Sequence, residues 1–480
     1  MNPQGRTRSS ASTTAQDTGW PSLTLPFGLM GVCLLWLLIE LGVLPALPLA
    51  TLCLAIASAA FMLVHGRGTA DVLHPVRVFG ALWCLCLALA SLRLLPMISD
   101  WSSLMWSCVL TALASFIGGF WLARRLWSPR SVAMNVTTLD AVPNGSLVLN
   151  RKTLIVAALC LTVGTTVLAY EYHLIGGIPA LAENVDAARQ TLFGFAGQIE
   201  PEFDTLYIKI IHPLTAFSKY GVFLAVIVLC QRRPKSRTVV LLSVVLILWG
   251  TLALASQGGR GFIVDIAVTS AALFHYVRRR IRVMELGAVC VALFLFLGVF
   301  GALRAKASES APLFQRAVST SRLPEGEFWD GIAFGYGTLT YSFEVFSRLI
   351  DDLPTTQRPA GGYLFYALHR FFARGNIQAL DLDLYSGEMI TPTFLGEFYA
   401  DYGYWGVLFG PLVLGVFYGW AYSRGGGPHD VYWIYVRAML LQVLIYFPYW
   451  NQFSHTLTWI FDLFFMYFLV RLLQRKPANA

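Results

Sequence analysis

Basic residues at the ends of apolar segments could bind a phosphate-bearing substrate. Arg260 lies in Ser-Gln-Gly-Gly-Arg-Gly (256–261), between two apolar runs, while Arg304 and Lys306 follow a later one. Guanidinium groups hold phosphate oxygens through paired hydrogen bonds, and glycines beside a helix N-terminus favour a bound anion. We predict that all three bind phosphate, with Asp265 orienting Arg260. The alternative is that they contact lipid headgroups or nearby acids, with Arg260 in a plain hairpin turn.

A carboxylate pair lies among aromatic residues in TPTFLGEFYADYGYWG (391–406). Glu397 and Asp401 are four residues apart, so a helix places them on one face. Aromatic rings stack on sugars, carboxylates bind their hydroxyls, and one carboxylate could act as a general base. We predict a catalytic role for Glu397 and substrate contacts for Asp401 and Tyr404. The alternative is an interfacial aromatic belt with a capping acid.

A third candidate group lies earlier in the same polar region. His369 could act as a base or bind a phosphate oxygen, and Arg370 and Arg374 share one face of a helix. Glu344 is a further acid, within the apolar and aromatic stretch 332–350, which we expect to form a helix on the membrane surface or between spans. We predict that His369 is catalytic and that the other three contact substrate. A solvated loop histidine is the alternative.

No cofactor or metal is expected. The sequence has no phosphate-binding Walker loop, no HExxH and no haem motif. Its 8 cysteines all lie in apolar runs, which argues against disulfides and a zinc site. Asp381-Leu382-Asp383 spells a DxD pair, but it falls in a segment predicted to face away from cytoplasmic nucleotide sugars.

Composition identifies the elements that must position these residues. Of the 480 residues, 56% are hydrophobic and only 13% are charged, whereas a soluble domain carries about 25% charge. We predict an all-α, polytopic membrane protein with about twelve transmembrane helices. The expected spans are 26–44, 47–64, 78–95, 104–126, 154–170, 213–230, 238–255, 261–277, 283–303, 403–422, 431–449 and 456–473.

Basic residues set the predicted orientation. They gather in alternate loops and at the C-terminus, which by the positive-inside rule puts both termini in the cytoplasm. The net charge of +8 then describes a surface facing anionic lipid, so membrane lipids are expected partners and nucleic acid is not. The predicted divisions are a disordered tail (1–22), nine helices with an outer loop near 171–212 (23–303), a large helical outer loop (304–392), three helices (393–474) and a second tail (475–480).

Two of these motifs resemble the O-antigen and exopolysaccharide repeat-unit polymerases of the Wzy type. The resemblance rests on SQGGRGF, on the long outer loop late in the chain, and on FLGEFYADYGYWGVLFGPLVLG, which is similar to that family's Gly-Glu-aromatic segment opening a span. It implies a GT-C-like, metal-independent glycosyltransferase in the bacterial inner membrane. This enzyme would polymerise undecaprenyl-diphosphate-linked repeat units at the periplasmic face, with arginines stabilising the departing diphosphate.

The resemblance also implies partners, namely a flippase and a chain-length-regulating co-polymerase. Two rival functions remain open. One is an O-antigen ligase, which is related to these polymerases. The other is a flippase or similar transporter, although transporters usually keep ionisable residues near the bilayer midplane, and here such residues gather toward the outer ends of the spans.

Overall fold

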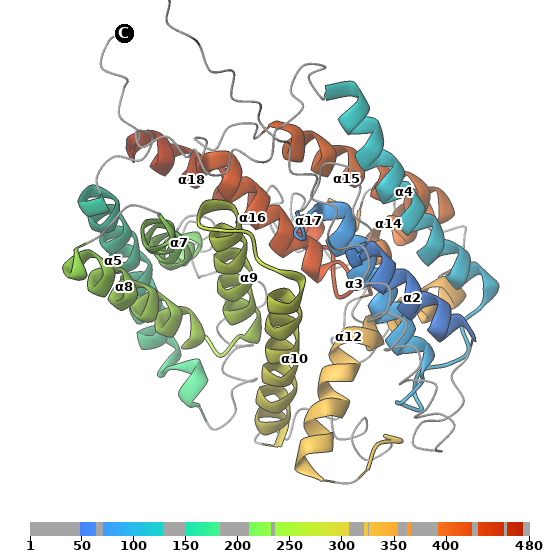
Figure 1. The fold of residues 1–480 in the computed structure, drawn as a ribbon. Helices are drawn as coiled ribbons and strands as arrows, with labels where there is room; N and C mark the ends of the chain where they lie inside the picture. Colours follow the sequence, from blue (N-terminus) through green and yellow to red (C-terminus); the bar gives the residue numbers. More distant parts are fainter. Residues whose placement is uncertain are drawn as a thin grey trace, which may run out of the picture.

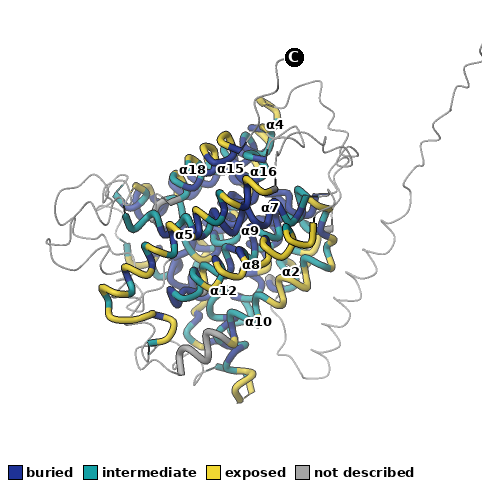
Figure 2. Tube along the Cα trace, turned by 90° about the vertical axis from the view of Figure 1, so that its left-hand side faces the viewer, coloured by how far each residue is buried: buried dark blue, intermediate teal, exposed yellow. Residues whose placement is uncertain are grey.

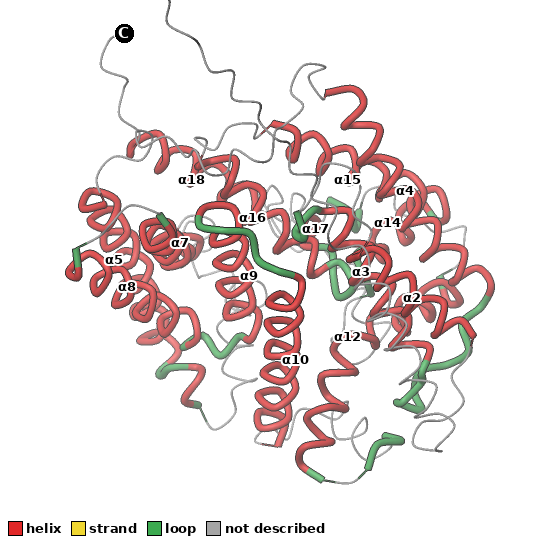
Figure 3. The backbone as a smooth tube through the Cα atoms, in the orientation of Figure 1, coloured by secondary structure: helices red, strands yellow, loops and turns green. Residues whose placement is uncertain are grey.

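The computed structural model describes residues 49–63, 71–127, 150–182, 211–231, 236–306, 321–324, 326–353, 362–365, 392–424, 431–455 and 458–473. The described residues form helices and short connections, without strands (Figure 3). The elements are α2 (Leu49–Leu63), α3 (Pro75–Ser91), α4 (Ser103–Trp127), α5 (Asn150–Ile175), η2 (Pro179–Leu181), η4 (His212–Ala216), α7 (Phe217–Cys230), α8 (Arg237–Ala255), α9 (Arg260–Val277), α10 (Val283–Lys306), α12 (Glu327–Asp352), α14 (Leu395–Tyr402), α15 (Tyr404–Arg424), α16 (Val431–Tyr446), α17 (Gln452–His455) and α18 (Thr458–Leu473).

The all-helical prediction is confirmed for the described residues, and each expected span after the first coincides with a helix there. Five helical segments are long and apolar enough to cross a membrane: Ser103–Trp127, Arg151–Ile175, His212–Cys230, Arg237–Ala255 and Tyr404–Arg424. The expected span at 26–44 and both predicted tails lie outside the described residues. The full count of about twelve spans stays a prediction.

An apolar exterior supports the membrane assignment. On α8, Leu241, Val245, Leu248 and Leu252 recur at helical spacing and are 48–69% exposed. Figure 2 shows exposed residues along the outward side of this helix. A continuous apolar stripe of this kind is unfavourable in water but matches the interior of a bilayer.

Arginines lie at one end of several helices. Arg124 and Arg125 lie in the last turn of α4, Arg424 ends α15, and Arg471 lies in the last turn of α18. In Figure 1, α4 and α18 end toward the top, whereas α10 ends and α12 begins at the bottom. We call the first the basic end and the opposite one the outer end, following the predicted orientation.

Close helix packing holds α4 against α15. A Cβ atom on Gly415 would lie 2.1 Å from the carbonyl oxygen of Phe116, and one on Gly119 would lie 2.1 Å from that of Leu412. Because only glycine allows two backbones to approach this closely, these glycines bring α4 and α15 into direct backbone contact. Gly406 likewise packs against Phe398 of α14.

The aromatic helix in the predicted outer loop packs between other helices. It spans Glu327–Asp352 as α12, and the Tyr336 hydroxyl donates to the carbonyl oxygen of Leu89 at 2.8 Å. A Cβ on Gly298 of α10 would lie 2.4 Å from the Gly331 carbonyl oxygen, so these helices also touch closely. α10 continues as a helix through Lys306, two residues past the predicted start of the outer loop at 304.

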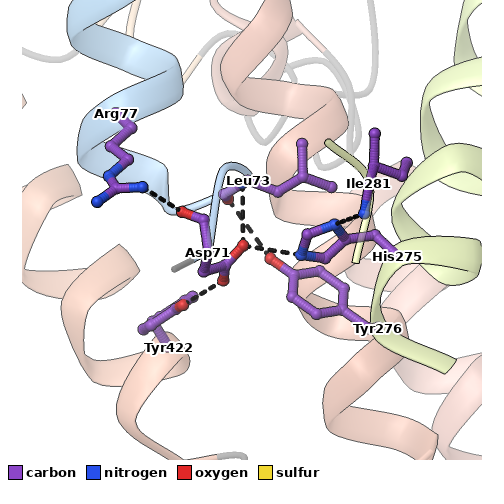
Figure 4. A network of polar contacts seen from close by, with 7 residues as sticks. All are labelled: Asp71, Leu73, Arg77, His275, Tyr276, Ile281 and Tyr422. Carbon is purple, nitrogen blue, oxygen red and sulfur yellow. Dashed lines mark hydrogen bonds and ion pairs between the residues drawn. The ribbon is translucent and has the colours of Figure 1, made fainter. Parts of the chain in front are cut away.

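A buried polar network ties helices together at the basic end (Figure 4). The Asp71 carboxylate accepts hydrogen bonds from the Leu73 N–H (2.9 Å), from Nε2 of His275 (2.9 Å) and from the Tyr422 hydroxyl (2.5 Å). The Ile281 N–H donates to Nδ1 of His275 at 2.9 Å, which places the ring proton on Nε2. Burial alone raises the pKa of Asp71, but the bonds from His275 and Tyr422 lower that pKa to about 2.

Candidate functional site

The turn that carries Arg260 is fixed in place at the outer end. Gly258 has φ +72°, a conformation that favours glycine, and Arg260 is the first residue of α9. The Tyr172 hydroxyl lies 2.7 Å from Oγ of Ser256, and the Ala180 N–H donates to the Ser256 carbonyl oxygen at 3.1 Å. A tight turn therefore joins α8 to α9. The structure describes only the backbone of Arg260.

Polar side chains lie directly beneath this turn, between α9 and α16. Nε2 of Gln442 donates to Asp265 at 2.7 Å, and the Tyr446 hydroxyl donates to the Gly261 carbonyl oxygen at 3.1 Å. Asp265 was expected to orient Arg260; this stays a prediction, because the Arg260 side chain lies outside what the structure describes. These contacts hold the start of α9 against the end of α16.

An ion pair between α7 and α18 extends this polar layer. Nζ of Lys219 lies 2.5 Å from Oδ2 of Asp462, and the Tyr220 hydroxyl donates to Oδ1 at 2.6 Å. Lys219 and Asp462 also act electrostatically on Asp265. Lys219 was not among the predicted site residues. The available signal was a lysine inside an apolar run, because an intramembrane charge needs a partner.

The predicted carboxylate pair lies on α14, within the Gly-Glu-aromatic motif identified in the sequence. Glu397 and Asp401 are both buried, with 2% and 3% exposure. Asp401 accepts hydrogen bonds from the N–H groups of Tyr363 (3.1 Å) and Leu364 (2.8 Å). Burial raises the pKa of Asp401 and the nearby charge of Glu397 adds to this, while the two backbone bonds oppose it. Asp401 thus positions the 362–365 turn.

The end of α16 joins the Arg260 turn to α14. Tyr446 bonds to Gly261, and the carbonyl oxygen of the next residue, Phe447, accepts the Phe394 N–H at 2.9 Å. The rings of Phe394 and Phe447 also stack, with centroids 4.4 Å apart. Tyr446 and Phe447 therefore bind the starts of α9 and α14, respectively. These two helix starts are more than a hundred residues apart in the chain but lie at the same end of the bundle.

Glu344 and Tyr404 have partners within the protein. Glu344 is 1% exposed, and it accepts hydrogen bonds from the Ser99 N–H (3.0 Å), Nε1 of Trp101 (3.1 Å) and Nε of Arg348 (3.1 Å). It therefore clamps α12 to the α3–α4 connection. The Tyr404 hydroxyl lies 2.7 Å from Oγ1 of Thr111. The contacts with Ser99, Trp101 and Thr111 were not predicted, because they join segments far apart in the sequence.

The remaining predicted residues are only partly placed. Arg304 and Lys306 lie in the last turn of α10, at the outer end, where the structure describes the backbone alone. His369, Arg370 and Arg374 lie outside the described residues. Their predicted roles stay predictions.

An apolar groove of about 550 Å³ lies beside α14. Phe398, Tyr402, Trp405, Phe409, Phe453 and Trp459 are among the residues that line it. Trp405 and Phe409 are 66% and 53% exposed, so the groove opens onto the apolar exterior. Such a groove suits a hydrocarbon chain arriving from the bilayer.

Within the described residues, no three His, Cys, Asp or Glu side chains are grouped so as to hold a metal ion. Comparison with protein-family models, with curated proteins and with solved structures finds no match to this chain.

Proposed function

We propose that this protein polymerises undecaprenyl-diphosphate-linked oligosaccharide repeat units into a surface polysaccharide, by metal-independent glycosyl transfer at the periplasmic face of the bacterial inner membrane. One observation carries the proposal. The Arg260 turn and the resembling segment of α14 are joined through Tyr446 and Phe447, beside a groove that opens onto the apolar exterior. A lipid-linked substrate needs a cation for its diphosphate and an apolar surface for its tail, close together.

The chemistry assigns these parts separate tasks. Arg260, at the N-terminus of α9, stabilises the charge that develops on the departing diphosphate. The acceptor hydroxyl oxygen bonds to the anomeric carbon of the donor as the bond from that carbon to the diphosphate oxygen breaks. The hydroxyl proton passes to a base. The groove beside α14 holds part of the polyprenyl tail and so fixes the distance of the diphosphate from the membrane.

The proposal also covers topology and partners. A GT-C-like arrangement of about twelve spans with both termini in the cytoplasm puts this end of the bundle in the periplasm. A flippase would deliver the repeat units, and a co-polymerase would set chain length. Membrane lipids surround the protein, and no nucleic acid takes part.

Deletion of the gene tests the function. We expect the ladder of surface polysaccharide on a gel to collapse to single capped repeats, and a plasmid copy to restore it. Accumulation of long lipid-linked chains without capped material would instead identify an O-antigen ligase. Repeat units trapped on the cytoplasmic side would identify a flippase.

Arg260→Ala tests the site. We expect this variant to abolish the ladder while leaving the protein level unchanged. Arg237→Ala, at the exposed start of α8 and far from the outer end, is the matched control and should restore the ladder fully. A full ladder with Arg260→Ala would remove this residue from the site.

A further inference from the structure

A histidine and a carboxylate form a close pair near the Arg260 turn. Nδ1 of His212, the first residue of η4, lies 2.7 Å from Oε1 of Glu171, which is near the end of α5. The Glu171 side chain is 5% exposed, whereas that of His212 is 27% exposed. The carboxylate is therefore enclosed, while the imidazole can be reached from outside.

This geometry prepares the imidazole to accept a proton. With Glu171 ionised, the Nδ1–H of His212 donates to the carboxylate, and Nε2 then has a free lone pair. A buried carboxylate that fixes the tautomer and orientation of a histidine is a recurrent feature of general-base catalysis, because it also stabilises the imidazolium that forms. The proton acceptor is thus Nε2, on a side chain that is 27% exposed.

The pair is connected to the Arg260 turn through one side chain. Tyr172, the residue after Glu171, lies 2.7 Å from Ser256 through its hydroxyl, and Ser256 is four residues before Arg260. The backbone of Ala180, just beyond α5, bonds to the same serine. The end of α5 therefore carries Glu171 and also supports the loop expected to hold the diphosphate.

We infer that His212 is the general base of the proposed glycosyl transfer and that Glu171 is its positioning residue. This inference rests on the proposed function. As the acceptor hydroxyl oxygen bonds to the anomeric carbon, its proton moves to Nε2 of His212. The diphosphate leaves with the electron pair of the broken carbon–oxygen bond. His212 suits this task better than Glu397, whose 2% exposure leaves no path for a sugar hydroxyl without movement of its cover.

The test uses the full-length protein purified in detergent, with lipid-linked repeat units extracted from the deletion strain as substrate. Initial rates of chain growth are measured for wild type, His212→Ala, Glu171→Gln and His173→Ala. His173 is the matched control, since it is an exposed histidine in the last turn of α5. A positioned general base contributes about 100-fold or more to the rate, so we expect at least that loss for His212→Ala and no loss for His173→Ala.

Added imidazole separates a chemical role from a structural one. We expect it to restore part of the rate of His212→Ala, because the small base fills the vacated space, and to leave the other proteins unchanged. Glu171→Gln should lower kcat and leave KM near the wild-type value, since it affects the orientation of the base and not substrate binding.

Two results would overturn the inference, and a third would overturn the proposed function. A wild-type rate for His212→Ala overturns it, as does a folded His212→Ala protein that imidazole does not rescue. If the wild-type protein itself does not join these repeat units into longer chains, the proposed function has failed. The elution profile of each variant on size exclusion identifies the folded proteins.

Discussion

Asp462→Asn should strongly destabilise the protein, because it removes the partner of a buried lysine. The carboxylate of Asp462 binds Lys219 at 2.5 Å and Tyr220 at 2.6 Å, and the two charged side chains are only 5% and 15% exposed. Breaking a buried ion pair by removing one partner costs about 3–5 kcal/mol. Since Lys219 has some access to the exterior and can shift toward it, we expect the lower part of that range.

The assay is heating in detergent followed by size exclusion, which gives the temperature at which half of the protein is lost. Asp100→Asn is the matched control, because Asp100 pairs with Arg93 at the surface with 84% of its side chain exposed. Exposed ion pairs contribute little to stability, so this variant should unfold like wild type.

A double variant gives the sharper result. In a Tyr220→Phe protein, which has no hydroxyl to leave unpaired, Lys219→Met with Asp462→Leu removes both charges and keeps apolar volume. This double change should recover most of the stability lost in Asp462→Asn. If Asp462→Asn unfolds at the same temperature as Asp100→Asn, the reasoning about burial fails. A double variant that is no more stable than Asp462→Asn would show that the loss does not come from an uncompensated Lys219.

Three further predictions concern other parts of the molecule. Gly415→Leu forces a side chain into the Phe116 backbone and should destabilise the fold by about 3 kcal/mol or more, measured as a lower yield of folded protein. Gly118→Leu is the control and should be tolerated, because the space around its Cβ position is open. Asp71→Asn should lower the free energy of unfolding by about 2 kcal/mol at pH 7. The lowered pKa of Asp71 stabilises the fold above pH 4, and this contribution is lost as the pH falls toward 2. Unfolding measured at pH 7 and at pH 3 should show the difference from wild type shrinking to roughly half. Val413→Trp should fill the groove beside α14 and raise KM for lipid-linked repeat units several-fold without changing kcat, measured as initial rates; an unchanged KM would separate the groove from substrate binding.

Helix positions were predictable because the signal for them is local. An apolar run long enough to cross a bilayer must satisfy its own backbone hydrogen bonds, and a helix does this within the run. The stretch 332–350 was also predicted as a helix, and α12 confirms it. The shared face of Glu397 and Asp401 follows from the same periodicity, and α14 confirms it.

Burial and partners of the polar residues were not predictable in this way. Asp401 was assigned to substrate, yet it binds the backbone of Tyr363 and Leu364. His212 and Glu171 only marked the limits of a predicted loop, although they lie 2.7 Å apart. No spacing rule relates residues this far apart along the chain.

The sequence by itself determined that the described part of the chain is helical and where its helices run. These properties depend on residues within a few turns of one another. Only the tertiary structure decided which helices meet at Tyr446 and Phe447, which acids are enclosed, and which histidine keeps a reachable nitrogen. A buried polar group must find its hydrogen-bond partner wherever packing brings one, and that partner usually comes from a distant segment.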